Sequence, residues 1–169
     1  VHPAFIPADH PLAAVRHEFN AMYLSADAAG NVMLYGKGAG QMPAASGVVS
    51  DVLDLARSLA CAAAPPVGVP ARADDPLELI PPDRVAGRYY VRFTTVDRPG
   101  VLSAIAGALG RHGVSIASCH QRGRSDQGPV AIVMTTHAAR ESDFRAAISE
   151  IDAMRAIVRK KTVAIRIEA

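Results

Sequence analysis

A proline-rich segment constrains the fold of this 169-residue chain more than any other feature. "CAAAPPVGVPARADDPLELIPPDR", residues 61–84, contains six prolines and no sustained apolar periodicity. Because proline lacks a backbone N–H and disfavours helix in the residue before it, this composition is typical of a linker. We therefore predict an N-terminal region of residues 1–64, a linker of residues 65–86 and a C-terminal domain of residues 87–169.

The N-terminal region is predicted to contain a hairpin and one long helix. Two segments, residues 19–26 and 31–35, are predicted to be strands. Between them, "DAAG" (residues 27–30) has the composition of a hairpin turn, in which Gly30 can adopt a positive φ. A helix is predicted over residues 43–63. Its apolar face consists of Val49, Val52, Leu53, Ala56, Leu59 and Ala60.

The C-terminal region alternates between strand and helix patterns. The predicted strands are residues 88–96, 114–121, 129–137 and 162–168, and the predicted helices are residues 99–113 and 141–154. The predicted apolar faces are Leu102, Ile105, Ala106 and Leu109 on the first helix and Phe144, Ala147, Ile148 and Ile151 on the second, and Val163, Ile165 and Ile167 point to one side of the last strand. This βαββαβ order predicts a ferredoxin-like fold, with both helices on one face of an antiparallel sheet. The open face and strand edges favour pairing with a second copy.

The segment "DRPGVL", residues 97–102, connects the first strand of this region to its first helix. Gly100 leaves room for a ligand, and the N–H groups of Gly100, Val101 and Leu102 lie at the positive end of the helix dipole, which favours a carboxylate. The nearby Asp97 can accept an ammonium group. An amino acid in its zwitterionic form would satisfy both charges. The alternative is that Asp97 caps the helix and the Pro-Gly pair only forms a turn.

The C-terminal region resembles an ACT domain in its βαββαβ order, in "DRPGVL" and in "GVSIASCHQRG" (residues 113–123). The resemblance covers residues 87–169. ACT domains are regulatory modules that bind small ligands, mostly amino acids, between paired copies. The resemblance therefore implies regulation by a small molecule.

Residues 1–60 resemble the end of the catalytic domain of homoserine dehydrogenases. The shared pattern is "HPLA", then "FNA", a hairpin, "GKGAG", Pro43 and "ASGVVSD" leading into a helix. The resemblance implies an α+β chain in which part of an α/β substrate-binding and dimerisation domain precedes the ACT domain. The family interconverts aspartate semialdehyde and homoserine with NAD or NADP, on the route to threonine, methionine and isoleucine. Since residue 1 is valine, we expect the chain to be a C-terminal fragment.

The glycine-rich turn "GKGAGQMP", residues 36–43, is not a Rossmann fingerprint, because Gln41 stands where G-x-G-x-x-G requires its third glycine. The resemblance implies instead that the turn faces the cleft where cofactor and substrate meet. The implied cofactor-binding residues are Gly38, Ala39, Gly40 and Pro43. Family members usually have threonine after the proline, and Ala44 lacks that hydroxyl. The alternative is that the glycines only allow the strand and helix to pack closely.

No residue of this chain is expected to be catalytic. The sequence contains no G-x-G-x-x-G, and the resemblance places the catalytic lysine upstream of Val1. Lys37, Lys160 and Lys161 do not lie in that motif. We therefore expect NAD(P) to serve the full-length parent, and we expect this fragment to bind it weakly and to be inactive alone.

Gln121 ends the second predicted strand of the ACT region, in "SIASCHQ". In ACT domains of this pathway, a glutamine at the matching position is associated with threonine. The resemblance thus implies a threonine site formed by Asp97, Gly100, Val101 and Gln121, with Ser115 and Ser118 as weaker candidates. It also implies a homodimer or tetramer, held by substrate-domain strands and by ACT–ACT pairing.

Composition argues against several other functions. A net charge of +2 with 20% charged residues does not indicate binding to nucleic acid or to an anionic membrane. The six histidines lack metal-ligand spacing, and two cysteines form no disulfide framework, which fits the cytoplasm. A second hypothesis is a stand-alone ACT-type binding or interaction module without an enzymatic parent. Residues 1–60 argue against it, because so small a region cannot bury its own apolar faces.

Overall fold

The computed structural model describes residues 1–60, 78–121 and 128–168, and it divides the chain into two compact units. One unit is Ala8–Glu78, and the other combines Val1–Pro7 with Leu79–Ala169. Residues 1–7 therefore fold with the C-terminal unit, although the sequence pattern groups them with the N-terminal region. Residues 65–77 of the predicted linker and residues 61–63 of the predicted helix lie outside the described residues.

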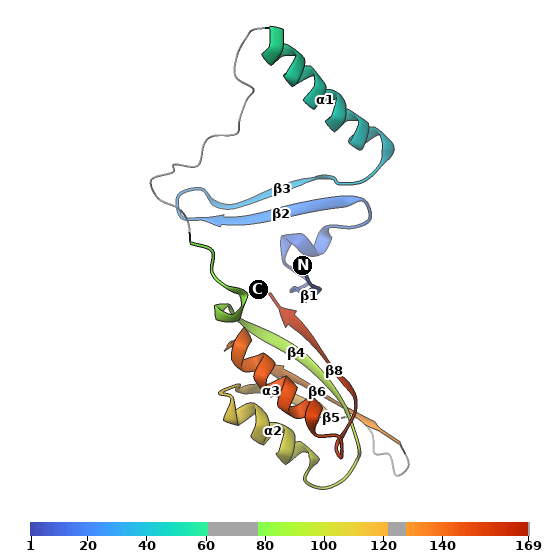
Figure 1. The fold of residues 1–169 in the computed structure, drawn as a ribbon, viewed down its shortest axis with the longest axis vertical. Helices are drawn as coiled ribbons and strands as arrows, with labels where there is room; N and C mark the ends of the chain where they lie inside the picture. Colours follow the sequence, from blue (N-terminus) through green and yellow to red (C-terminus); the bar gives the residue numbers. More distant parts are fainter. Residues whose placement is uncertain (61–77, 122–127, 169) are drawn as a thin grey trace. The chain divides into compact units, whose positions relative to one another are not determined.

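The unit Ala8–Glu78 contains the predicted hairpin and long helix (Figure 1). Its elements are a short 3-10 helix (Pro11–Ala14), β2 (Phe19–Ala26), β3 (Gly30–Lys37) and α1 (Gln41–Ala60). β2 and β3 pair antiparallel, and Gly30 adopts φ 68° opposite Ala26, as the turn chemistry predicts. β3 continues beyond the predicted residue 35 to Lys37, and α1 begins at Gln41.

The apolar face of α1 is exposed along its length. All the positions that the spacing marks as apolar are solvent-accessible, and Leu59 is 82% exposed. In the described part of the chain the helix has no buried residue. An amphipathic helix normally owes most of its stability to tertiary packing of that face. No helix among the described residues is both long and apolar enough to cross a membrane.

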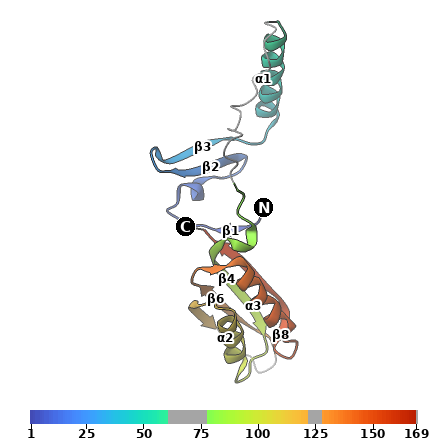
Figure 2. The ribbon, with the colours of Figure 1, turned by 60° about the vertical axis from the view of Figure 1, so that its left-hand side comes forward.

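The C-terminal unit has the predicted ferredoxin-like order. Its main elements are β4 (Ala86–Thr95), α2 (Val101–Arg111), β5 (Ile116–Gln121), β6 (Val130–Thr136), α3 (Glu141–Ala153) and β8 (Val158–Ile167). The sheet order is β1-β8-β4-β6-β5, and the short β7 (Ala139–Arg140) also pairs with β4. Two views show α2 and α3 on the same face of the sheet (Figures 1 and 2). A short 3-10 helix (Pro82–Arg84) precedes β4.

An additional edge strand, which the sequence pattern does not predict, comes from the start of the chain. β1 (Ala4–Phe5) pairs parallel with the end of β8, with Ala4 opposite Arg166 and Phe5 opposite Ile167. The Phe5 carbonyl oxygen accepts a hydrogen bond from the Glu168 N–H at 2.9 Å. The Phe5 ring contacts the Tyr90 ring edge-on, with the ring centroids 5.3 Å apart.

The core lies between the sheet and the two helices. It is formed by alternate residues of β4 and β6 and by one stripe of each helix, including Val91, Phe93, Ile132, Met134, Ile105, Leu109, Ala147 and Ile151. The stripe of α2 differs from the prediction. Val101 and Ala108 are buried with Ile105 and Leu109, whereas Leu102 is 44% exposed. The helix is rotated about its axis so that its i, i+4, i+7 and i+8 positions meet the sheet.

β8 begins at Val158 rather than at residue 162 and has an irregular register opposite Arg92–Thr95. Val163, Ile165 and Ile167 share one side of the strand, as predicted, but that side faces away from the helices. The alternating residues face the helices: Thr162 is buried, and Arg166 reaches the first residue of α3. Side-chain alternation specifies which residues share a side, but the packing of the helices decides which side becomes the core.

Candidate functional site

The predicted effector residues converge where β4 leads into α2. Gln121, the last residue of β5, donates from Nε2 to Asp97 Oδ1 at 3.4 Å. At 3.4 Å this hydrogen bond is long. Gly100 is the N-cap of α2 and adopts φ 89°, in the left-handed region that glycine tolerates best. Among the described residues, apart from the adjoining backbone, no atom lies within 4 Å of where a Cβ would stand on Gly100.

The side chain of Val101 belongs to the core, so only its main chain can serve the ligand contact that the sequence predicts. Its side chain is 4% exposed and belongs to the core, and its N–H donates to the Arg98 carbonyl oxygen at 3.4 Å. Any contact that Val101 makes with a ligand is therefore restricted to its main chain. Of the weaker candidates, Ser118 is hydrogen-bonded to Thr135 on β6 at 2.7 Å.

The local geometry favours glycine at two positions of the turn before α1. The Gly38 N–H donates to the Glu18 carbonyl oxygen at 2.8 Å, and a Cβ on Gly38 would lie 1.8 Å from Asn20 Nδ2. Gly40 has φ 122°, and its carbonyl oxygen accepts the Ala44 N–H in the first turn of α1. Close packing and a positive φ thus explain why these positions are glycine, whatever else the turn contacts.

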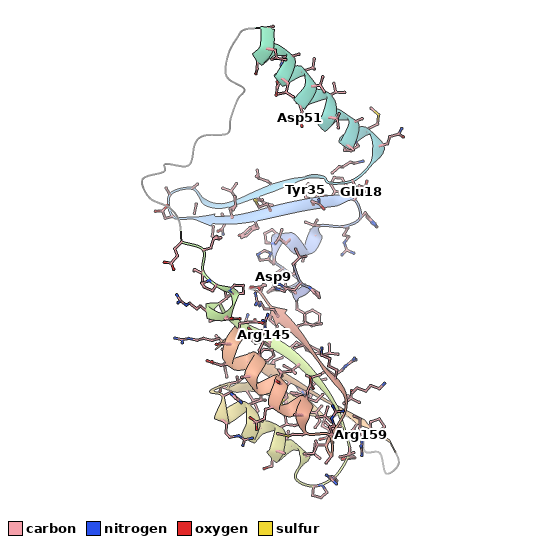
Figure 3. All side chains as sticks on the ribbon, in the orientation of Figure 1. Asp9, Glu18, Tyr35, Asp51, Arg145 and Arg159 are labelled. Atoms are coloured by element: carbon pink, nitrogen blue, oxygen red, sulfur yellow. The ribbon has the colours of Figure 1, made fainter. Side chains whose placement is uncertain are left out.

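Charged and aromatic side chains surround the glycine turn on the hairpin. Glu18 and Tyr35 lie near the end of the hairpin that leads into α1 (Figure 3). Lys37 Nζ lies 3.4 Å from Glu18 Oε1 and 5.7 Å from the centre of the Phe19 ring. Phe19 and Tyr35 stack with their centroids 4.8 Å apart. Since Glu18 pairs with it, Lys37 has its charge compensated within the hairpin.

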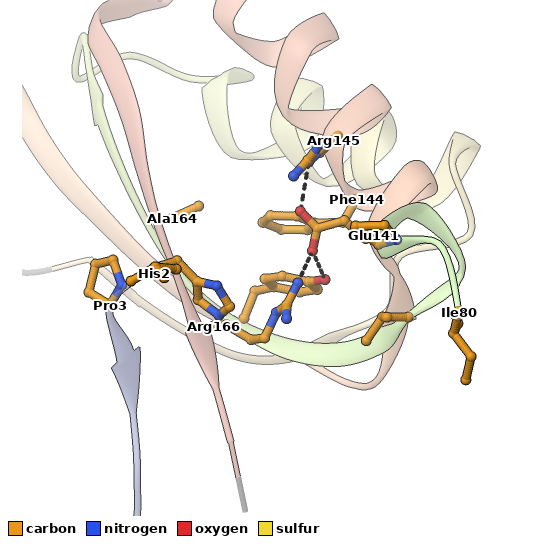
Figure 4. Close-up of a pocket in the computed structure, with 12 residues that line it drawn as sticks. His2, Pro3, Ile80, Glu141, Phe144, Arg145, Ala164 and Arg166 are labelled. Carbon is orange, nitrogen blue, oxygen red and sulfur yellow. Dashed lines mark hydrogen bonds and ion pairs between the residues drawn. The ribbon is translucent and has the colours of Figure 1, made fainter. Parts of the chain in front are cut away.

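A buried ionic cluster lies at the other end of β4 from Asp97. Glu141, which is 8% exposed, accepts hydrogen bonds from the Tyr89 hydroxyl at 2.7 Å, from Arg166 at 2.6 Å and from Arg145 at 2.7 Å (Figure 4). The Tyr89 ring stacks on Phe144 with the centroids 3.7 Å apart. The cluster thereby joins β4, α3 and β8 beside a cavity of about 550 Å³.

The cluster shifts the pKa values of its members in opposite directions. Burial raises the pKa of Tyr89 to about 12, and its hydrogen bond to the Glu141 carboxylate acts in the same direction. Burial alone would raise the pKa of Glu141, but hydrogen bonds from Tyr89, Arg166 and Arg145 outweigh it and lower that pKa. Glu141 is therefore ionised at neutral pH, as the partner of Arg166.

The sequence contains only a weak signal for this cluster. Arg166 alternates with Ile165 and Ile167 on the last strand, so it must occupy the opposite side from them. A charged residue on the side that meets a helix requires an opposite charge, and Glu141 at the start of α3 supplies it. The described residues contain no group of three or more His, Cys, Asp or Glu side chains placed to hold a metal ion.

Two family models match the chain in succession. Residues 1–53 match homoserine dehydrogenase, and residues 89–156 match the ACT domain. A homoserine dehydrogenase from Synechocystis is 39% identical over 93% of this chain, and one from Neisseria gonorrhoeae is 37% identical over all of it. These alignments span 37% and 39% of the two relatives. The chain therefore spans less than two fifths of their length.

Solved structures give the same result. The crystal structure of a homoserine dehydrogenase from Thiobacillus denitrificans superimposes with a TM-score of 0.76 and 35% identity. The superposition covers 99% of this chain and 38% of the chain in that crystal structure. A Staphylococcus aureus homoserine dehydrogenase, at 23% identity and a TM-score of 0.54, shares the fold. The chain is thus similar to homoserine dehydrogenase over residues 1–53 and to the ACT domain over residues 89–156, and as a whole it is similar to part of such enzymes.

Proposed function

We propose that this chain is the C-terminal part of a homoserine dehydrogenase, which interconverts aspartate semialdehyde and homoserine with NAD(P). The observation that supports this most is the succession of the two family matches, together with similarity to such enzymes over 93–100% of the chain. The second hypothesis, a stand-alone ACT-type module, does not explain why residues 1–53 match homoserine dehydrogenase.

NAD(P), the hydride carrier of this reaction, fits the glycine turn only as a main-chain contact. Gly38 and Gly40 present no side chain, and Ala39 and Pro43 provide no charged group, so the turn would hold a polar part of the cofactor through backbone N–H groups. The chain's own Lys37 is paired with Glu18. We therefore expect the turn to form part of the cofactor site and the chain alone to be inactive.

The ACT domain would provide feedback by threonine. The amides at the start of α2 suit the effector carboxylate, Asp97 suits its ammonium group, and the Gln121 amide suits its hydroxyl. The 3.4 Å contact between Gln121 and Asp97 supports this assignment, because it places both side chains at one helix start. Threonine that binds one arrangement of paired ACT domains more tightly would bias the catalytic domains toward it.

Homo-oligomerisation would cover surfaces that this chain leaves exposed. The apolar face of α1 and the helix-free face of the ACT sheet are both accessible in the described residues. We expect α1 and the β2–β3 hairpin to pack against the remainder of the catalytic domain and against a second subunit, and ACT domains to pair with each other. Such a biosynthetic enzyme would be cytoplasmic.

Calorimetric titration of threonine into the 169-residue chain tests the regulatory assignment. We expect saturable binding that is selective over methionine and isoleucine and about tenfold weaker in Gln121→Ala, since one lost hydrogen bond is worth about 1.4 kcal/mol. His120→Ala is the matched control, because His120 is an exposed neighbour on the same strand, on the other side of the sheet. If the folded wild-type chain binds none of these amino acids, the effector assignment is wrong.

The enzymatic assignment has its own test. A protein that extends upstream of residue 1 should reduce NAD(P)⁺ in the presence of homoserine, whereas the 169-residue chain should not. Turnover by the short chain, or none by a folded longer protein with either cofactor, would contradict the proposal.

A further inference from the structure

One strand of the ACT sheet, β1, comes from outside residues 89–156, which match the ACT domain. β1 lies within residues 1–53, which match homoserine dehydrogenase, yet it pairs with β8 in the C-terminal unit. The chain leaves that unit after Pro7 and returns to it at Leu79. The chain therefore passes between the two units twice, at residues 7–8 after β1 and at residues 78–79 before β4.

β1 is attached to the sheet by main chain and side chain. The Glu168 N–H donates to the Phe5 carbonyl oxygen at 2.9 Å, and the Phe5 ring contacts Tyr90 on β4. The attachment is small, because Phe5 remains 46% exposed. A two-residue edge strand of this kind can detach at a small free-energy cost without unfolding the sheet.

The partner of β1 is fixed to the rest of the C-terminal unit. Arg166, opposite Ala4, is bound by Glu141 at 2.6 Å, and Glu141 in turn is bound by Tyr89 on β4. A shift of β4 relative to β8 therefore cannot occur without moving the groups that hold Arg166. The end of β8 and β4 thus belong to one hydrogen-bonded network.

β4 also connects this network to the proposed effector site. Near the start of β4, Tyr89 lies opposite Arg166 of β8. At its other end, Asp97 follows two residues after the last strand residue, Thr95. Its ten residues span about 33 Å at the usual rise of a strand. One continuous strand thus has the effector loop at one end and the β8–β1 contact at the other.

We propose that pairing of Ala4–Phe5 with Arg166–Ile167 is the coupling element through which effector occupancy reaches the catalytic region. This rests on the proposed function, and it adds which contact carries the regulation. The effector biases β4, β4 and the Glu141 cluster set the position of the end of β8, and β1 passes that position to residue 8 and beyond.

The test measures thermodynamic coupling in a protein that includes the upstream catalytic region. The dissociation constant of homoserine is determined with and without saturating threonine, and the ratio of the two is the coupling factor. We expect a factor of about 5 or more in the wild type, which is the usual range for allosteric coupling. Phe5→Ala should bring the factor toward 1, and Phe5→Pro, which also removes a backbone N–H, should do so more fully.

Two controls separate coupling from folding and from effector binding. Leu79→Ala removes an apolar side chain that is 89% exposed in the same unit, and it should leave the coupling factor unchanged. In the 169-residue chain, Phe5→Ala should bind threonine within twofold of the wild type. Hydrogen exchange at the Glu168 amide should become faster in both Phe5 variants, because the strand that carries its carbonyl acceptor detaches more often.

The outcomes distinguish this inference from the proposed function. If the wild type does not bind threonine, the effector assignment fails and the coupling inference fails with it. If the wild type binds threonine and is coupled, but both Phe5 variants with fast Glu168 exchange keep the full factor, only the role of β1 is wrong. Threonine binding with a coupling factor of 1 in the wild type would also overturn the role of β1.

Discussion

The Tyr89 hydroxyl donates a 2.7 Å hydrogen bond to Glu141 Oε2, across 52 residues of sequence. This contact joins β4 to the first residue of α3, and Arg166 on β8 completes it from the other side at 2.6 Å. A carboxylate that is 8% exposed depends on these donors, because an unpaired buried charge is strongly unfavourable. The cluster therefore contributes to the stability of the C-terminal unit as a set rather than as separate bonds.

Replacement of Glu141 should destabilise the chain. In Glu141→Gln the side-chain shape is kept, but Arg166 loses its main counter-charge, and we expect a loss of about 3 kcal/mol in the free energy of unfolding. Denaturant unfolding monitored by circular dichroism measures this change. Asp143→Asn, an exposed acid in the same first turn of α3, is the matched control and should cost less than 1 kcal/mol.

The Glu141 contribution should depend on pH in the acid range. Its folded-state pKa lies below the ordinary value of 4.5, so the stabilisation is fully present above that value and is lost as pH falls through the folded-state pKa. The stability difference between wild type and Glu141→Gln should accordingly shrink as pH is lowered below about 4.5. A difference that stays constant from pH 7 to pH 3 would show that Glu141 does not titrate as the structure implies.

Thr95 offers a change that should stabilise the protein. Among the described residues, its Oγ1 is the one buried side-chain oxygen without a hydrogen-bond partner, and the residue is fully buried. Thr95→Val replaces the hydroxyl with a methyl group of similar size, so it should raise the free energy of unfolding by about 1 kcal/mol. Thr136→Val is the contrasting variant, because Thr136 Oγ1 accepts the Tyr89 N–H at 3.0 Å, and it should be destabilising.

The glycine turn permits a rescue experiment in the longer protein. Gly38→Ala places a Cβ against the Asn20 side chain and should lower kcat/KM about tenfold or more, because displacement of a turn by about 1 Å has large effects on catalysis. Adding Asn20→Ala removes the atoms that clash and should restore much of the activity. Gly36→Ala is the control, because apart from the adjoining residues no atom of the described part of the chain lies within 4 Å of the new Cβ. A double variant no better than Gly38→Ala would show that the clash is not the cause.

Patterns local in sequence predict much of this fold. The turn at residues 27–30, the two hairpin strands and the βαββαβ order all follow from side-chain periodicity and turn chemistry, and the structure confirms them. The strand order also places Asp97 and Gln121 at the same edge of the sheet, where they form a hydrogen bond. Relationships that depend on distant packing are not encoded in this way. The rotation of α2 that exposes Leu102 and the inward side of β8 were decided by how the layers meet.

β1 is the clearest example of an element that local sequence patterns do not predict. Two residues, Ala4 and Phe5, carry no periodicity from which a strand could be recognised, and their partner lies at the other end of the chain. The ionic cluster has the same character, because Tyr89, Glu141 and Arg166 are far apart in sequence and each is unremarkable in its own segment. Contacts of this kind become visible only in three dimensions.

The pairing of β1 with β8 also has a consequence for the order of folding. Residues 4–5 are synthesised about 160 residues before their partners at 166–167, which takes on the order of 10 s at usual rates of translation. During that time β1 has no strand to join, and closing so long a loop is entropically unfavourable until the rest of the sheet exists. The edge strand is therefore expected to dock last, onto a C-terminal unit that has already folded.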